Sequence, residues 1–314
     1  MAIHLDNNPI KRTGVNVAFC CDDNFYLSFK TTLYSLFINH QDCFFNIYFF
    51  GSISSSNRVD LLNFVKVYSS NLFFVDFDYS FFAKYFDASS YYYNNLKRLL
   101  LPFYCKNVDY LLYLDSDLII QKNIDDLLHL DIAGYAVALA LDFNTDSFKL
   151  VESIRSTYRL DFYYNAGVLL YNCTFIREQY TLDDLVLFVE KNNNLPFFDQ
   201  DIVNIFYKNH IFTLGKEYNY QIRHYDKSNN IIKSSRIIHY INIKPWQKHY
   251  PFFTRKSRFF WRYGKYIFGT KRKHLIRLAQ CKQSILLLLK TTMVKLKKDL
   301  KYLARILNFF KKDI

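Results

Sequence analysis

The apolar run Tyr110 to Leu114 ends at the acidic triplet Asp115-Ser116-Asp117. Consecutive apolar residues without alternation are typical of a strand buried on both faces of a parallel sheet. Ligands bind at the carboxyl ends of such strands in open α/β sheets. Two carboxylates so close together repel each other, and a hard divalent cation removes that repulsion. A solvated turn is the alternative, because Asp and Ser are common turn residues.

Strand-like runs alternate with helical patterns through the first 250 residues, which predicts a mostly parallel α/β sheet. One helix is predicted from the cap residues Ser54 to Ser56 as far as about Tyr68, and another within Tyr93 to Tyr104. The sequence holds neither G-x-G-x-x-G nor G-x-x-x-x-G-K, which argues against NAD-binding and P-loop proteins. The other predicted strands are Val15 to Cys21, Asn46 to Phe50, Asn71 to Phe77, Tyr135 to Leu141 and Val168 to Tyr171.

Composition excludes several classes of protein. An apolar content of 51% is too high for a disordered chain. No apolar run approaches the roughly 20 residues that span a bilayer, and the first residues lack the apolar stretch of a secretory signal. The six cysteines show no C-x-x-C pair and no zinc-finger spacing, so we expect reduced thiols in a cytoplasmic protein.

The net charge of +13 is unevenly distributed along the chain. Residues 251–314 contain 18 Lys and Arg against two Asp, whereas residues 1–250 contain 23 basic and 26 acidic residues. All the excess positive charge therefore lies in the last 64 residues. We expect a nearly neutral body, large enough for a catalytic domain, over residues 1–250 and a basic, mainly helical segment over residues 251–314.

Four further segments carry polar residues at the ends of predicted elements. Asp22-Asp23-Asn24 follows the first strand, Asn165-Ala166-Gly167 precedes the apolar run VLLYN, and Asp199-Gln200-Asp201 begins a helical pattern. His239 lies in the run RIIHY, and Lys244-Pro245-Trp246 follows five residues later. The glycine of the second segment permits close approach of the backbone to a ligand. For His239 taken alone, a hydrogen-bonded core histidine is the default interpretation.

Together these motifs resemble glycosyltransferase family 8, whose members are retaining transferases of nucleotide-activated hexoses with a Rossmann-like GT-A fold. The sequence looks most similar to the bacterial lipopolysaccharide galactosyl- and glucosyltransferases. The resemblance implies UDP-glucose or UDP-galactose as donor and a saccharide or glycolipid acceptor, with the lipopolysaccharide or lipooligosaccharide core expected. It runs from about Val15 to Trp246 and rests on FCCDDNF, KRLLLP, YLDSDLII, YYNAGVLLYN, FDQDIVN and HYINIKPW.

The resemblance implies a metal site. In the family, the D-x-D carboxylates and the histidine of the closing motif bind Mn²⁺, which bridges the phosphates of the UDP-sugar. Here these residues are Asp115, Asp117 and His239, with Mg²⁺ as the alternative ion, and this ligand set suits Mn²⁺. Lys244 is expected to add a positive charge beside the diphosphate. Many relatives have a longer closing motif that contains a glycine, so the loop before Lys244 is expected to be tighter or differently shaped.

The resemblance also assigns residues to the donor and the acceptor. Asp22 and Asn24 match residues that hydrogen-bond the uracil and ribose, and Phe25 replaces a tyrosine that stacks on uracil, so an aromatic face is kept. Asp142 matches an acceptor-side carboxylate. The other residues expected to contact the nucleotide-sugar are Arg98, Asp115, Ser116, Ala166 and Lys244. The catalytic residues expected around the transferred sugar are Asn165, Asp199 and Gln200.

Retention of configuration admits two routes. A double displacement needs a carboxylate nucleophile, for which Asp199 is nearest in sequence, because the amide of Gln200 is a poor nucleophile. In front-face displacement the leaving phosphate accepts the proton of the acceptor, while Gln200 and Asn165 position the sugar. The second route is favoured here, and both stay open.

The basic segment has a pattern of its own. From Lys271 to Phe310, clusters such as Lys271-Arg272-Lys273 alternate with apolar residues in a pattern that suits amphipathic helices on an anionic leaflet. We therefore expect peripheral association with the inner face of the cytoplasmic membrane. A solvated helical face packed on the body is the alternative, and no binding of nucleic acid is expected.

Two rival functions belong to other classes. Phosphatases and phosphotransferases of the haloacid-dehalogenase type also carry a D-x-D at a strand end, but they have Thr or Val where Ile119 stands. A non-catalytic membrane- or nucleic-acid-binding protein is the other rival. It gives no reason for the joint presence of Asp115, Asp117, His239 and Gln200.

Overall fold

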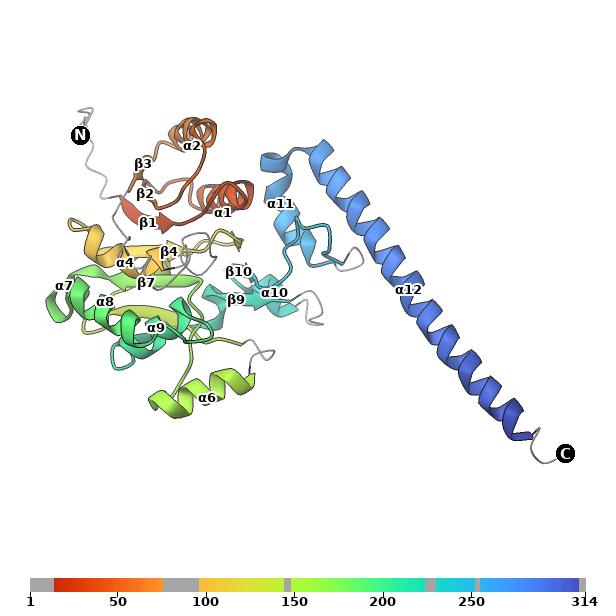
Figure 1. Cartoon of the computed structure of the whole chain (residues 1–314). Helices are drawn as coiled ribbons and strands as arrows, with labels where there is room; N and C mark the ends of the chain where they lie inside the picture. The colour runs from red at the N-terminus through yellow and green to blue at the C-terminus, as the bar shows by residue number, and fades with distance from the viewer. Residues whose placement is uncertain (1–13, 76–95, 144–147, 224–229, 252–254, 311–314) are drawn as a thin grey trace. The chain divides into compact units, whose positions relative to one another are not determined.

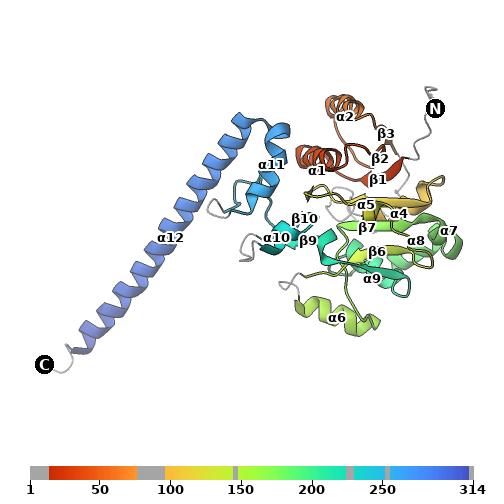
Figure 2. The same cartoon turned by 180° about the vertical axis from the view of Figure 1, so that it is seen from behind.

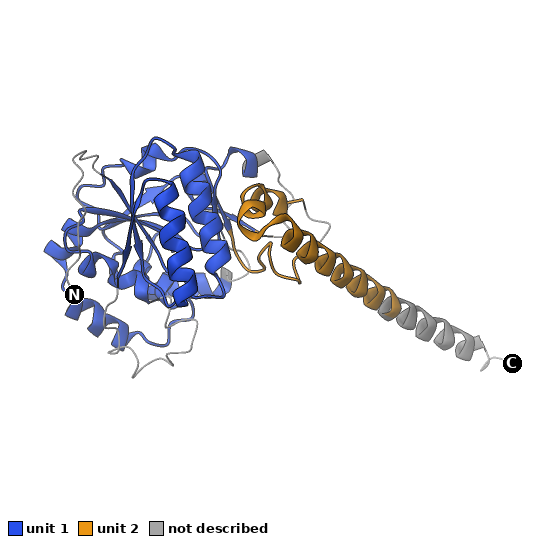
Figure 3. Ribbon diagram, turned by 90° about the horizontal axis from the view of Figure 1, so that it is seen from above, with its two compact units in different colours: residues 1–222, 228–239 blue, residues 223–227, 240–314 orange. Residues whose placement is uncertain are grey.

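The structure is a computed structural model that describes residues 14–75, 96–143, 148–223, 230–251 and 255–310. Its contacts divide the chain into two compact units, shown in Figure 3. Residues 1–222 and 228–239 form the first unit, and residues 223–227 and 240–314 form the second. The functional division predicted near Pro251 falls within the second unit and stays a prediction.

The first unit is built on a seven-stranded sheet with the order β3-β2-β1-β4-β7-β6-β8 (Figures 1 and 2). Neighbouring strands are parallel except at β7, which runs antiparallel to β4 and β6. This confirms the predicted α/β class and mostly parallel sheet. The strands are β1 (Val15–Phe19), β2 (Phe45–Phe49), β3 (Asn71–Phe74), β4 (Tyr110–Leu114), β6 (Val137–Ala140), β7 (Val168–Asn172) and β8 (Ile211–Leu214). The last two residues of the predicted third strand, 76 and 77, lie outside the described residues.

Two hydrophobic layers cover the faces of this sheet, because successive side chains of a strand point to opposite faces. Leu112 and Leu114 of β4 pack in one layer with residues of α1 and α2. Leu111 and Tyr113 pack in the other layer with residues of α4, α7, α8 and α9. The helices of the first unit are α1 (Tyr26–Asn39), α2 (Ser55–Val67), α4 (Lys97–Tyr104), α5 (Asp125–Leu128), α6 (Phe148–Tyr158), α7 (Cys173–Gln179), α8 (Leu182–Lys191), α9 (Asp199–Phe206) and α10 (Asn230–Ser234).

A second, three-stranded sheet has the order β5-β10-β9. It consists of β5 (Leu118–Ile120), β9 (Tyr220–Ile222) and β10 (Ile237–Tyr240), and a short 3-10 helix, Lys216–Tyr218, precedes β9. β5 begins directly after the acidic triplet and pairs antiparallel with β10, where His239 lies opposite Leu118. This pairing places His239, the last residue of the first unit, beside the residues that follow β4.

The second unit consists mainly of α11 (Ser257–Phe268) and α12 (Thr270–Phe310), which confirms the predicted helical C-terminal segment. Phe260 of α11 packs against Trp246, with ring centroids 4.8 Å apart. Gly269 ends α11 with a φ of 75°, a conformation that glycine adopts without strain. Among the described residues, no helix combines the length and the apolarity that a membrane crossing requires.

Candidate active site

The turn after β4 is held on two sides by the rest of the first unit. The backbone N–H of Asp115 donates to the carbonyl of Gly167 at 2.9 Å. On the other side, the hydroxyl of Thr32 in α1 lies 3.2 Å from the carbonyl of Ser116 and 2.8 Å from that of Leu118. Thr32 is fully buried. The triplet is therefore a fixed part of the fold and differs from the solvated turn that the sequence left open.

The structure brings together Asp115, Asp117 and His239, the three residues predicted to ligate a metal. Nε2 of His239 lies 3.3 Å from Oδ1 of Asp117 and 3.8 Å from Oδ2 of Asp115. One ligand atom from each residue lies within 4.8 Å of the others. Adjacent oxygen ligands of a small octahedral cation are about 3 Å apart, since each lies about 2.1 Å from the ion. The two carboxylates and one imidazole therefore fit a divalent cation.

Gly167 leaves the space that this cluster occupies. A Cβ atom at position 167 would lie 2.4 Å from Cε1 of His239, 2.7 Å from its Nδ1 and 3.0 Å from Oδ2 of Asp115. The first two distances are shorter than real Cβ contacts. Glycine is thus required here by the side chains of the cluster, in addition to the close backbone approach that the sequence indicated.

Arg98 of α4 is a buried cation beside the cluster, with 6% of its surface exposed. Its Nη2 lies 3.0 Å from Oδ1 of Asp115, and its Nε lies 3.1 Å from Oδ2 of Asp199. Its Nη1 donates to the carbonyl of Ala166 at 2.7 Å. Burial raises the pKa of the Asp199 carboxyl, and the Arg98 guanidinium opposes that shift. One guanidinium thus joins three of the predicted site residues.

Asn165, Gln200 and Asp142 form a second group connected by side-chain amides. Nδ2 of Asn165 donates to Oε1 of Gln200 at 3.1 Å, and Nε2 of Gln200 donates to Oδ2 of Asp142 at 2.8 Å. Phe198, the residue before α9, has a φ of 46°, which is strained for a residue with a side chain. Phe198 is buried in the core, and this packing maintains the turn that presents Asp199 and Gln200.

Asp22, Asn24 and Phe25 lie between β1 and α1, where β1 is the parallel neighbour of β4. Oδ1 of Asp22 accepts from the backbone N–H groups of Asn24 and Phe25 at 3.0 and 3.2 Å. The carboxyl ends of β1 and β4 lie at one edge of the sheet, because the two strands are parallel. The predicted uridine-binding residues therefore follow the strand next to the acidic triplet.

Lys244 belongs to the second unit, and its predicted contact with a diphosphate stays a prediction. In the loop before it, Asn242 has a φ of 61°. Asparagine enters this left-handed region more readily than most residues. Asn242 thus makes a turn in a segment without glycine, and the different shape expected of this loop stays a prediction.

Three residues that support the site were not identified from the sequence. Asn219, which is fully buried, lies 3.0 Å from Nδ1 of His239 and 2.8 Å from Oδ1 of Asn165. The hydroxyl of Tyr113 donates to Oδ1 of Asp115 at 2.7 Å. Gln221 donates to the carbonyl of Leu141, the residue before Asp142. Asn219 and Gln221 belong to none of the six motifs, and Tyr113 belongs to YLDSDLII without any sign there of its contact with Asp115, so their distances identify all three.

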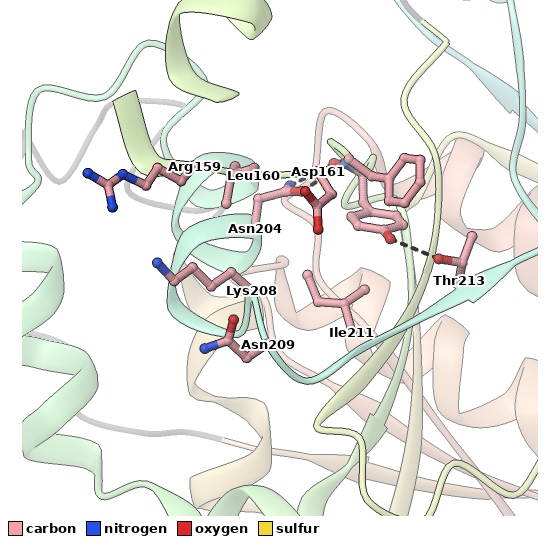
Figure 4. Close-up of a pocket in the computed structure, with 10 residues that line it drawn as sticks. Arg159, Leu160, Asp161, Asn204, Lys208, Asn209, Ile211 and Thr213 are labelled. Atoms are coloured by element: carbon pink, nitrogen blue, oxygen red, sulfur yellow. Dashed lines mark hydrogen bonds between the residues drawn. The ribbon is translucent and has the colours of Figure 1, made fainter. Parts of the chain in front are cut away.

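A cavity of about 260 Å³ lies beside α9 and β8 (Figure 4). The described residues that line it include none of the predicted site residues. Asn204 and Tyr164 belong to its wall, and Nδ2 of Asn204 donates to the carbonyl of Gln200 at 2.8 Å. The cavity is therefore adjacent to the predicted site residues through Tyr164, which precedes Asn165, and through Asn204, which lies one helical turn after Gln200.

The sequence model described as glycosyl transferase family 8 matches residues 16–249. The chain belongs to glycosyl transferase family 8. This match includes every predicted site residue and confirms the resemblance, together with the enzyme class, the glycosyltransferases, that it implied. It argues against the phosphatase and the non-catalytic alternatives.

Similar proteins extend the family assignment. The lipopolysaccharide 1,2-glucosyltransferase of Escherichia coli K12 is 31% identical over 152 residues, which cover 45% of this chain and 45% of that relative. A putative glycosyltransferase of Haemophilus influenzae is 26% identical over 213 residues, which cover 66% of this chain and 63% of the relative. The matches thus span less than two thirds of either relative.

The crystal structure of the galactosyltransferase LgtC in complex with donor and acceptor sugar analogs has the same fold. It superimposes with a TM-score of 0.67 at 21% identity, covering 80% of this chain and 95% of LgtC. The predicted GT-A fold is therefore confirmed.

Proposed function

We propose that the protein transfers glucose or galactose, with retention of configuration, from a UDP-sugar to a saccharide acceptor of the lipopolysaccharide or lipooligosaccharide core. The observation that carries this proposal is the cluster of Asp115, Asp117 and His239 within a family 8 chain. The names of the relatives, a lipopolysaccharide 1,2-glucosyltransferase and a galactosyltransferase, support the choice of sugar and acceptor.

The proposed cofactor is Mn²⁺, with Mg²⁺ as the alternative, held by Asp115, Asp117 and His239. When bound, it supplies positive charge that stabilises the departing diphosphate. Asp22, Asn24 and Phe25 bind the uridine, while Lys244 adds a cation beside the diphosphate. Arg98 keeps Asp115 in place and, through its contact with the Ala166 carbonyl, the backbone that faces the donor sugar.

Front-face displacement is the proposed route. The carboxylate of Asp199 is 7% exposed and is engaged by Arg98, so it is poorly placed to act as a nucleophile. Gln200 and Asn165 orient the transferred hexose through their amides. Asp142, which accepts a hydrogen bond from Gln200, orients an acceptor hydroxyl toward the sugar. The proton of that hydroxyl passes to the leaving phosphate oxygen.

The proposed location is the inner face of the cytoplasmic membrane. Residues 251–314 hold 18 Lys and Arg. On α12, Leu287 and Leu288 are 61% and 60% exposed. Basic residues attract an anionic leaflet, and exposed leucines on a helix insert into its interface.

The proposed transferase activity is tested with Mn²⁺ and a panel of UDP-sugars. The melting temperature of the protein and the release of UDP are measured. We expect Mn²⁺ with UDP-glucose or UDP-galactose to stabilise the protein and release UDP, and Asp115→Asn to remove both responses. Asp109→Asn is the matched control, because Asp109 precedes the same strand at its other end and is exposed. Absence of any response in the unmodified protein refutes the transferase proposal.

A further inference from the structure

Asn219 connects the two groups of the candidate active site. It lies between the 3-10 helix and β9 and is fully buried. One side of its amide faces Oδ1 of Asn165 at 2.8 Å, and the other faces Nδ1 of His239 at 3.0 Å. The direction of these two hydrogen bonds depends on which amide atom is the oxygen, and the surrounding backbone determines this.

The backbone of Gly167 sets the direction of the first hydrogen bond. Its N–H can only donate, and it donates to Oδ1 of Asn165 at 3.0 Å. The Asn165 atom that also faces Asn219 is therefore an acceptor. Asn219 must present its NH₂ group to this oxygen, which leaves its own Oδ1 facing His239. An oxygen acceptor at this place requires a proton on Nδ1 of His239.

The backbone N–H of Ala166 sets the direction of the hydrogen bond between Asn165 and Gln200 in the same way. Its N–H donates to Oε1 of Gln200 at 3.2 Å, and Nδ2 of Asn165 donates to the same oxygen at 3.1 Å. The NH₂ group of Gln200 is consequently the one that reaches Asp142. Two consecutive backbone amides thus orient a chain of side chains that runs from Asp142 to His239.

We propose that Asn219 is a positioning residue that holds the neutral ring of His239 in the Nδ1–H tautomer. The lone pair of Nε2 then faces Asp115 and Asp117, as a metal ligand must. This inference rests on the proposed function only for the role of His239 as a ligand. The tautomer itself is a property of the protein without metal.

The first test is the ¹⁵N spectrum of the histidine rings in the metal-free protein, recorded at a pH where the rings are neutral. The chain contains eight histidines, and the signal of His239 is the one that His239→Gln removes. We expect the nitrogen shifts of the Nδ1–H tautomer. An Nε2–H tautomer in the unmodified protein overturns the proposal without need of any Asn219 variant.

The second test uses Asn219→Leu, which removes both hydrogen bonds while keeping the number and branching of the side-chain heavy atoms, and Asn219→Asp, which keeps the acceptor for Nδ1–H. We expect Asn219→Leu to lose the Nδ1–H signature and to bind Mn²⁺ about 10- to 100-fold more weakly, the usual cost of losing such a supporting contact. Asn219→Asp should retain the tautomer. An Asn219→Leu protein that folds and keeps both the tautomer and the Mn²⁺ affinity also overturns the proposal.

Asn172→Leu is the matched control. Asn172 is also a buried asparagine with two hydrogen bonds, to the N–H of Phe175 and the carbonyl of Ile132, at the end of β7. It should lose stability and leave the His239 spectrum and the Mn²⁺ affinity unchanged. Asp115→Asn should remove Mn²⁺ binding but keep the tautomer. Mn²⁺ binding is measured by the electron paramagnetic resonance of the free ion. The tautomer is measured without metal, so a failure of the proposed function is distinguishable from a failure of this inference.

Discussion

The guanidinium of Arg98 lies 3.0 Å from the carboxylate of Asp115, so the first acidic residue of the triplet has a cation of the protein as its neighbour. The same guanidinium lies 3.1 Å from Asp199. Arg98 and Asp199 are both buried, so bulk water screens their charges little. The arrangement ties the stability of the fold to the geometry of the site.

Replacing Arg98 by Met should destabilise the protein by about 3–5 kcal/mol, because a buried carboxylate then lacks its partner. The loss should shrink at acidic pH, since burial already raises the pKa of Asp199 and protonation removes the uncompensated charge. Urea unfolding at neutral and acidic pH measures both effects. Arg177→Met is the control, because Arg177 donates to the backbone carbonyls of Pro102, Cys105 and Val108, which do not titrate. Equal pH dependence in the two variants would contradict the prediction.

Gly167→Ala should weaken Mn²⁺ binding more than it weakens the fold. The added Cβ would lie 2.4 Å from Cε1 of His239, so the imidazole must move away from Asp115 and Asp117. Calorimetric titration with Mn²⁺ measures the loss. Gly264→Ala serves as control. Its added Cβ would lie 2.8 Å from Phe260, which is a similar steric conflict, but Gly264 belongs to the second unit and its close contacts are with Phe260 rather than with a residue of the cluster. A Gly167→Ala protein with unchanged Mn²⁺ affinity would show that the ring has room to adjust.

Asp201 should make the stability of the protein fall as pH rises from about 4 to 6. Burial raises the pKa of Asp201 from 3.8 to about 6, against hydrogen bonds from Tyr163 and Phe197 that lower it. In this window the Asp201 carboxyl binds more protons in the folded state than in the unfolded state, so raising the pH removes its contribution to stability. The stability of the unmodified protein relative to Asp201→Asn should therefore drop by at most about 3 kcal/mol. Denaturant titrations of both proteins across this pH range measure the difference in their free energies of unfolding. A difference that stays constant with pH would refute the prediction.

The basic segment should bind vesicles that contain anionic lipid and not neutral vesicles. Reversing Lys295, Lys297 and Lys298 to Glu should reduce co-sedimentation at least tenfold, since each basic residue near such a surface contributes about 1 kcal/mol. Added salt should weaken the binding of the unmodified chain. The control reverses three exposed lysines of the first unit, Lys106, Lys191 and Lys208. Equal sedimentation of the two triple variants would argue against the membrane role of the segment.

The strand that carries the acidic triplet could be predicted from the sequence because its side chains are buried on both faces. Leu111 to Leu114 are all at most 1% exposed, and an unbroken apolar run is the direct sequence pattern of such burial. The contribution of His239 could be inferred only through the resemblance to the family. In the sequence it lies in an apolar run that is equally typical of a core histidine.

The supporting residues were beyond sequence reasoning for a different reason. Asn219 acts through hydrogen bonds to residues 54 positions before it and 20 positions after it. No periodicity records such contacts, since they depend on tertiary packing. The positive φ of Phe198 could not be predicted either, because nothing in the local sequence favours this conformation for a buried aromatic residue.

The pairing of β5 with β10 has a consequence for the order of events during synthesis. Asp117 precedes β5 and His239 lies in β10, more than 100 residues later. Closing so long a loop is entropically costly, so it follows the formation of local structure. A nascent chain that has emerged through β8 already contains all seven strands of the main sheet but lacks His239, the third residue of the cluster. The three side chains of the cluster therefore come together only after β10 has been synthesised and has paired with β5, which makes their assembly a late step in the formation of the first unit.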